Sequence, residues 1–261
     1  MSGVFALIAR EVRTQVYSPI AWVVWTLFMF LAGWFFVSLV YQFAVVAENA
    51  TAYAAMMQAG EISERLNLNE LVISGLFSNL LILLVFLIPV LTMRSFAEER
   101  KQGTDELLLT APVTPGQLVA GKYLGQLAIS GVLVVAGAFY IVVLLRYGDP
   151  ERGPIVTGLV GLTLVVAALT AIGFAISTFT RSQVVAAVSS FVLFLLLFVV
   201  DWPSESTDGI ARTALKALSL PAHFEGFAKG NVASTDVAYF LSMTALGLFA
   251  ARASLASQRW R

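Results

Sequence analysis

Residues 71–93 read LVISGLFSNLLILLVFLIPVLTM, and residues 94–122 continue as RSFAEERKQGTDELLLTAPVTPGQLVAGK. The first stretch is an apolar run without charged residues, and it has the length that crosses a bilayer as one α-helix, about 20 residues. The second stretch gathers charged residues into one segment, and a further long apolar run follows it. This alternation predicts a membrane protein that concentrates its charge in one loop, which indicates a docking surface for a partner in water.

The composition of the whole chain supports the same class of protein. Of its 261 residues, 59% are hydrophobic and 12% are charged, and the mean hydropathy is +0.85. Soluble domains are about a quarter charged. The formal net charge of zero gives no indication of a nucleic-acid partner. The absence of cysteine excludes disulfides and thiolate metal sites, and a single histidine, His223, excludes a histidine-rich metal site.

Six apolar segments are predicted to cross the membrane. They cover residues 19–41, 71–93, 123–145, 155–179, 184–200 and 237–251. Ser18 and Pro19 predict the start of the first helix, since Ser is a favoured N-cap and Pro suits the first helical position. Residues 114–117 (TPGQ) and 180–183 (TRSQ) predict capping boxes before the third and fifth spans. The predicted fold is an all-α integral membrane protein with one transmembrane domain over residues 1–261.

The distribution of Lys and Arg predicts the orientation of the chain. With a cytoplasmic N-terminus, ten of the 16 Lys and Arg residues lie on the inner side and six on the outer side. This is the asymmetry that the positive-inside rule describes. Both termini and the charged segment 94–122 are therefore predicted to be cytoplasmic, and residues 201–236 are predicted to form an external loop.

Residues 2–17 are predicted to form an amphipathic helix that lies in the inner membrane interface, with its arginines near anionic lipid. The predicted apolar face consists of Val4, Phe5, Ile8, Val12 and Val16. The predicted polar face consists of Arg10, Glu11, Arg13, Thr14 and Gln15.

The predicted spans carry no ionisable residue well inside them, so they offer no proton relay of the kind that carriers and pumps use. Energy for uphill transport would then enter from outside the bilayer. Residues 116–123 (GQLVAGKY) fit the phosphate-loop pattern until the last position, where Tyr123 replaces the Ser or Thr that holds magnesium. We therefore expect ATP chemistry on another polypeptide. Gly121 and Gly125 form a small-xxx-small pattern, which is interpreted as a site of close packing between helices or between copies.

The charged segment is predicted to contain two helical parts. The second span, kinked at Pro89, is predicted to continue through residues 96–101 and to stop at Gly103. A short helix over residues 104–110 is predicted next, with acidic residues in its first turn and leucines on one face. Such an exposed helix suits a groove on a soluble partner, whereas the alternative is a solvated loop with surface charges.

The string FAEERKQGTDELLLTAPVT at residues 96–114, with Gly121 and Lys122, resembles the permease subunits of type-2, exporter-like ATP-binding-cassette (ABC) transporters. The resemblance extends over almost the whole chain. Residues 220–232 (LPAHFEGFAKGNV) resemble the subgroup named for gliding motility and its relatives in nitrous-oxide-reductase maturation. The family implies a multi-pass protein of the bacterial cytoplasmic membrane. It also implies a pair of permease subunits, either two copies of this chain or this chain with a homologue.

The resemblance further implies one ATPase subunit beneath each permease, with ATP and Mg²⁺ bound by the ATPase and no cofactor or catalytic residue on this chain. The implied coupling residues are Glu98, Glu99, Arg100, Lys101, Gly103, Thr104, Asp105, Glu106, Leu107, Leu108 and, in a smaller second contact, Arg181. Short external helices are implied near residues 210–218 and 223–229, where His223 would have a structural or interfacial role.

Two other functions stay open on the sequence. In the first, the subunit transports nothing and relays ATPase-driven motion to an external partner, which would bind residues 45–70 with their four glutamates. In the second, the chain is an intramembrane enzyme, which would need clustered His, Asp or Glu residues at membrane depth. The spans contain no such cluster. For a transporter, the apolar spans favour an amphiphile, a polymer or a peptide over a small ion.

Overall fold

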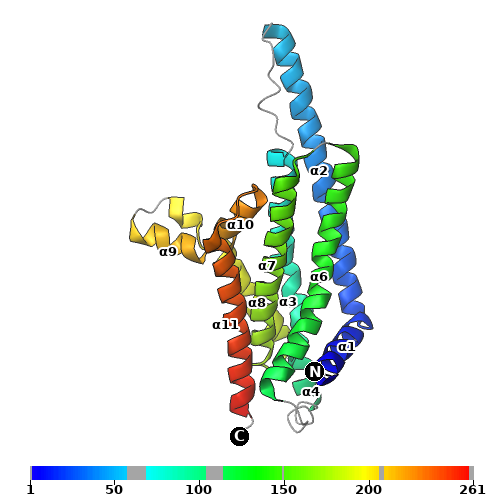
Figure 1. The fold of residues 1–261 in the computed structure, drawn as a ribbon, viewed down its shortest axis with the longest axis vertical. Helices are drawn as coiled ribbons and strands as arrows, with labels where there is room; N and C mark the ends of the chain where they lie inside the picture. The colour runs from blue at the N-terminus through cyan, green and yellow to red at the C-terminus, as the bar shows by residue number, and fades with distance from the viewer. Residues whose placement is uncertain (1, 58–68, 104–113, 149, 206–208, 259–261) are drawn as a thin grey trace.

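The computed structural model describes residues 2–57, 69–103, 114–148, 150–205 and 209–258, and the regular structure in these ranges is helical (Figure 1). Five segments in these ranges are long and apolar enough to cross a membrane. Their apolar parts belong to α2 (Pro19–Met57), α3 (Gly75–Thr92), α6 (Pro115–Tyr147), α7 (Arg152–Ser177) and α11 (Ser234–Gln258). The predicted all-helical membrane fold is confirmed.

The predicted fifth span corresponds to α8 (Gln183–Val199), which is apolar but has only 17 residues. At 1.5 Å per residue this helix is roughly 26 Å long, slightly less than the hydrocarbon core. The end of α11 lies at the same end of the bundle as α1 (Ser2–Val16) and α4 (Ala97–Gln102) (Figure 1).

The first long helix, α2, exceeds the predicted span, since it runs on to Met57 instead of ending near residue 41. Residues 42–57 (QFAVVAENATAYAAMM) contain neither Gly nor Pro and are rich in Ala, which is the best helix former. The extension projects beyond the other helices at the end of the bundle away from the termini (Figure 1). Residues 58–68, the middle of the proposed external contact, lie outside the described residues.

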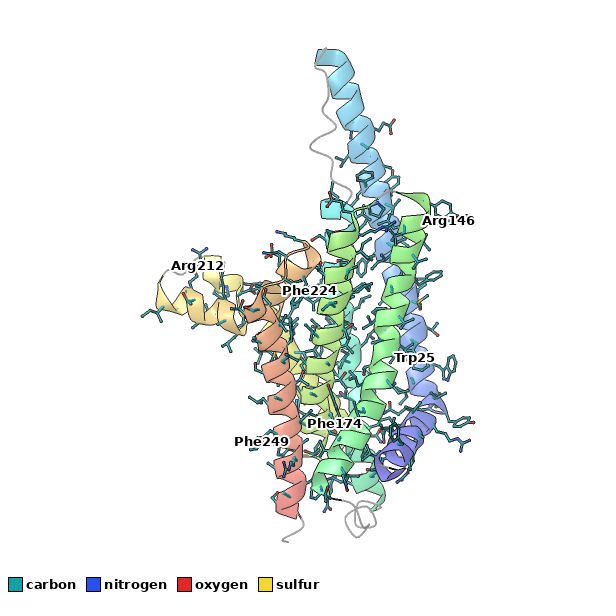
Figure 2. The ribbon with its side chains drawn as sticks, viewed as in Figure 1. Trp25, Arg146, Phe174, Arg212, Phe224 and Phe249 are labelled. Atoms are coloured by element: carbon teal, nitrogen blue, oxygen red, sulfur yellow. The ribbon has the colours of Figure 1, made fainter. Side chains whose placement is uncertain are left out.

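Helix α7 lies at the centre of the bundle and contacts α3, α6, α8, α10 and α11. Its contact with α11 is a close approach of two backbones, because a Cβ atom added at Gly247 would lie 2.7 Å from the carbonyl carbon of Ala171. Phe174 lies within the bundle, whereas Phe249 points away from it and is exposed (Figure 2). Small residues between helices and apolar side chains on the outer surface are typical of a bundle surrounded by lipid.

The predicted capping box at the start of α6 is confirmed. Gln117 N donates to Thr114 Oγ1 at 3.3 Å, and Thr114 N donates to Gln117 Oε1 at 3.0 Å. The capping box predicted at residues 180–183 is wrong. Ser182 is the N-cap of α8 and accepts from Val185 N, while Thr180 accepts from Ser182 N and stays outside the helix.

The predicted continuous helix from the second span into the charged segment is also wrong, because α3 ends at Thr92 and α4 starts at Ala97. Phe96 lies between them, is 2% exposed and packs against Phe174 with ring centroids 5.1 Å apart. The turn at residues 93–96 brings this ring into the bundle, and the burial of the ring favours the turn over a straight helix.

Helix α4 ends where the sequence predicts. Gly103 has φ of 69°, a left-handed conformation that glycine adopts without steric cost. The predicted helix at residues 104–110 lies outside the described residues, and so do Thr104, Asp105, Glu106, Leu107 and Leu108.

A short 3-10 helix, η3 (Trp202–Glu205), follows α8, and two short α-helices come after it, as the resemblance implied. They are α9 (Ile210–Leu218) and α10 (Leu220–Ala228), which starts three residues before the implied position. The ring of His223 stacks on Tyr239 at 4.1 Å, and its Nδ1 lies 2.7 Å from Asp236 Oδ1. These contacts join α10 to α11 and are consistent with a structural role for the histidine.

Candidate functional site

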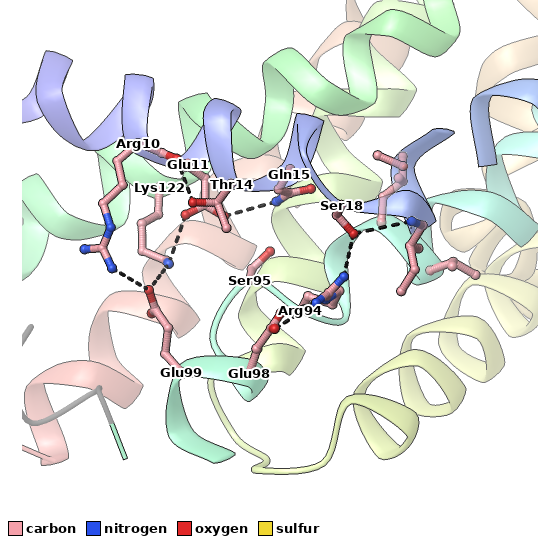
Figure 3. Close-up of a pocket in the computed structure, with 14 residues that line it drawn as sticks. Arg10, Glu11, Thr14, Gln15, Ser18, Arg94, Ser95, Glu98, Glu99 and Lys122 are labelled. Atoms are coloured by element: carbon pink, nitrogen blue, oxygen red, sulfur yellow. Dashed lines mark hydrogen bonds and ion pairs between the residues drawn. The ribbon is translucent and has the colours of Figure 1, made fainter. Parts of the chain in front are cut away.

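Polar side chains gather at the end of the bundle that carries both termini, where α1, α4 and α6 meet (Figure 3). We call this group the polar cluster. Its members are Arg10, Glu11, Gln15, Ser18, Arg94, Ser95, Glu98, Glu99, Lys122 and Gln126. It contains three basic and three acidic side chains. Lys122 is the most buried of these charges, and a buried charge is stable only when it is paired and hydrogen-bonded.

Lys122 of α6 is at the centre of the cluster. Its Nζ lies 2.9 Å from Glu99 Oε1 on α4 and 3.1 Å from Glu11 Oε2 on α1, and its side chain is only 4% exposed. The ammonium group also lies 4.8 Å from the centre of the Phe96 ring, where the face of the ring attracts a cation. One cation therefore links three helices.

Glycines on α6 allow α1 to come close enough for this link. A Cβ atom added at Gly125 would lie 2.6 Å from Glu11 Cβ, and one added at Gly121 would lie 2.8 Å from Leu7 Cβ. The small-xxx-small pattern thus accommodates α1 of the same chain. The predicted polar face of the N-terminal helix is divided in the structure: Glu11 and Gln15 face α6 and bind polar groups there, whereas Arg10, Arg13 and Thr14 are exposed.

Gln126 is a second link, one turn after Lys122. Its side chain is fully buried, accepts from Ser95 Oγ at 2.9 Å and from Gln15 Nε2, and donates to the Leu91 carbonyl at 3.3 Å. Sequence reasoning missed this role. Gly121 and Lys122 are followed one turn later by Gly125 and Gln126. Residues four apart lie on the same face of a helix, so the sequence already shows a face of α6 with small and polar residues.

Arg94 anchors the start of the charged segment. Its guanidinium group donates to both oxygens of Glu98, at 2.6 and 2.7 Å, and to Ser18 Oγ. The two parallel bonds to the carboxylate give the strong fork geometry that arginine favours. Because Ser18 precedes α2, this contact ties α4 to the junction of α1 and α2.

The structure separates the predicted coupling residues into two groups. Glu98 and Glu99 point into the polar cluster (Figure 3). Lys101 and Gly103 are exposed at the end of α4, and Arg100 beside them is partly exposed. Arg181 is exposed in the loop between α7 and α8, apart from the cluster.

The resemblance to a phosphate loop is not reflected in the structure. Residues 116–123 lie in the first turns of α6, so their backbone N–H groups do not form a loop around a phosphate. Lys122, which would contact the phosphates, is paired with Glu11 and Glu99 instead.

The family model described as ABC-2 family transporter protein matches residues 5–225. The match covers the entire polar cluster and all the described helices from α2 to α9. No curated protein matches the chain. Since the matched residues make up most of the 261, this chain belongs to the ABC-2 transporter family and is a multi-pass transmembrane component of an ABC transporter.

Proposed function

We propose that this protein forms, as a dimer, the translocation path of an ABC transporter in the cytoplasmic membrane of a bacterium, driven by separate ATPase subunits. Membership of the ABC-2 family supports a membrane subunit that works with an ATP-binding partner. The observation that carries the proposal further is the buried Lys122, which joins α4 to α1 and α6. A partner that moves α4 would also move the long helix α6.

The ATPase binds, in this proposal, at the end of the bundle that carries the polar cluster. The exposed end of α4, with Lys101 and Gly103, forms the contact together with residues 104–108 and, separately, Arg181. Glu98 and Glu99 lie within the polar cluster, where their ion pairs with Arg94 and Lys122 hold α4 in place. ATP and Mg²⁺ belong to the ATPase.

Movement passes through ion pairs in this arrangement. Closure of the ATPase pair displaces α4. The ion pair between Glu99 and Lys122 then moves α6 together with α4, and the ion pair between Glu11 and Lys122 moves α1 together with α6. The helices would then move as rigid bodies between two packed arrangements, which open toward opposite sides of the membrane. Buried charge pairs suit this role because separating them costs several kcal/mol, of the order of 3–5 when one partner is lost.

The proposal includes six crossings with both termini in the cytoplasm. The common position of the termini and the balance of Lys and Arg support it. We also propose that residues 220–232 place the protein near the gliding-motility subgroup, on the sequence resemblance alone.

Coupled ATP hydrolysis provides the test, because it needs no knowledge of the substrate. The wild-type chain, reconstituted with its ATPase, should raise ATP hydrolysis above that of the ATPase alone. Glu99→Gln should still bind the ATPase but lose most of this stimulation, about tenfold for each 1.4 kcal/mol of coupling lost. Glu225→Gln is the matched control, because Glu225 is exposed and pairs with Lys229 on α10, far along the chain from α4. Normal stimulation by Glu99→Gln would contradict the proposed path of force.

A further inference from the structure

A pocket of about 290 Å³ lies beside the polar cluster (Figure 3). Members of the cluster and Thr14 form its polar wall. Ile20, Ala21, Val90 and Leu91 form its apolar wall. The pocket therefore has the two-sided character that an amphiphile requires.

The position of the two walls gives the depth of the pocket in the membrane. Ile20 and Ala21 belong to the first turn of α2, and Val90 and Leu91 to the last turn of α3, so the apolar wall is the end of two spanning helices. The polar wall is the charged end of the bundle. Such a boundary between apolar helices and charged side chains lies at the level of lipid headgroups.

The charge of the pocket favours a zwitterion over an anion. Its three basic side chains, Arg10, Arg94 and Lys122, face three acidic ones, Glu11, Glu98 and Glu99. Its volume is at the lower limit of small-molecule sites, roughly 300 Å³, which suits a headgroup and the start of its chains.

Arg10 is the basic side chain best placed to bind a ligand. Its side chain is 61% exposed, and its ion pair with Glu99 is long, at 4.0 Å. Arg94 and Lys122, in contrast, are held by carboxylates at 2.6 to 3.1 Å. A guanidinium group binds phosphate oxygens with paired hydrogen bonds, and the neighbouring carboxylates accept hydrogen bonds from an ammonium group.

We propose that this pocket binds a zwitterionic phospholipid whose headgroup ends in a primary amine, as in phosphatidylethanolamine. The phosphate binds Arg10, the ammonium group donates to Glu98 and Glu99, and the glycerol end of the chains lies against Ile20 and Val90. A quaternary amine has no N–H to donate, so phosphatidylcholine binds less well. The proposal requires only that the chain lies in a membrane, and not that it transports anything.

The lipid that stays bound to the protein after extraction from a membrane measures this binding directly. The full chain is reconstituted in vesicles of equal parts phosphatidylethanolamine, phosphatidylcholine and phosphatidylglycerol, extracted mildly, and analysed by native mass spectrometry. The wild-type protein should retain phosphatidylethanolamine in excess over the other two lipids. Arg10→Gln should reduce this excess by about tenfold or more, because the paired charge-assisted hydrogen bonds to the phosphate are lost. Thr14→Trp, which fills the pocket from an exposed position, should abolish it.

Arg13→Gln is the matched control, since Arg13 is an exposed arginine on the same helix but does not line the pocket. It should retain lipid like the wild type. Equal losses in Arg10→Gln and Arg13→Gln would overturn the proposal, because they would indicate general attraction to the membrane surface. Equal retention of phosphatidylcholine, or preferential retention of phosphatidylglycerol, would also overturn it. Displacement of the lipid by millimolar soluble phosphoethanolamine would show a site for the free headgroup instead.

Discussion

Lys122 and Glu99 form an ion pair of 2.9 Å that joins α6 to α4 at the end of the bundle carrying both termini. Both side chains are largely shielded, and Glu11 binds the same ammonium group from α1. Because a shielded charge needs its partner, this pair fixes the position of the charged segment on the spanning helices. The stability of the fold and the proposed transmission of force depend on the same contact.

Lys122→Met should destabilise the protein by about 3–5 kcal/mol, because it leaves Glu11 and Glu99 close together without a cation. Thermal unfolding in a fixed detergent measures the change. The triple variant Glu11→Gln, Glu99→Gln, Lys122→Met should be more stable than Lys122→Met alone, since it leaves no unpaired charge. A triple variant less stable than the single one would show that the charges are not what the substitution disturbs.

Gly125→Ala should separate α1 from α6. The added methyl group would lie 2.6 Å from Glu11 Cβ, closer than real carbon atoms approach, and overpacking of this kind costs about 1–3 kcal/mol. Gly131→Ala on the same helix meets no atom within 4 Å and should stabilise the helix slightly, by about 0.5–1 kcal/mol. Unfolding curves of the two variants should therefore shift in opposite directions, and a common shift would contradict the close packing of α1.

Gln126→Leu should cost about 1–3 kcal/mol, because Gln15 and Ser95 lose the carbonyl oxygen that accepts from them and the Leu91 carbonyl loses a donor. Thermal unfolding again gives the magnitude. Gln117→Leu is the matched control on the same helix, since Gln117 lies at the exposed start of α6 and only its capping bond is lost. Its cost should be nearer 1 kcal/mol. Equal costs would indicate that Gln126 is not a central link.

Gly103→Ala should loosen the end of α4, because a left-handed conformation costs an alanine about 1–2 kcal/mol. Hydrogen exchange of the α4 amides should become faster by about tenfold for each 1.4 kcal/mol. Gly116→Ala, at a position with negative φ and open space around it, should leave the exchange of these amides unchanged. Unaltered exchange in Gly103→Ala would show that this glycine does not determine where α4 ends.

Features set by local chemistry could be predicted from the sequence. The capping box at Thr114 and the stop at Gly103 depend on a few adjacent residues, and both occur where expected. The apolar segments predicted the all-helical membrane fold because the length needed to cross a bilayer is fixed.

Features set by tertiary contacts could not be predicted in the same way. Glu11 lies among charged and polar residues in the sequence, which does not show what its side chain contacts. Its pairing with Lys122, more than 100 residues away, turns the side chain toward α6. The break before α4 depends on a site for Phe96 that α7 supplies through Phe174. Neither partner can be identified by spacing along the chain.

The most direct test measures whether α6 moves when the ATPase closes. Since the chain has no cysteine, Val142→Cys places one spin label on an exposed position of α6 in each copy of the proposed dimer. In the reconstituted complex, trapping with ATP and vanadate should change the distance between the two labels. The triple variant Glu11→Gln, Glu99→Gln, Lys122→Met should bind the ATPase and show no such change. The same change in wild type and triple variant would contradict transmission through the polar cluster.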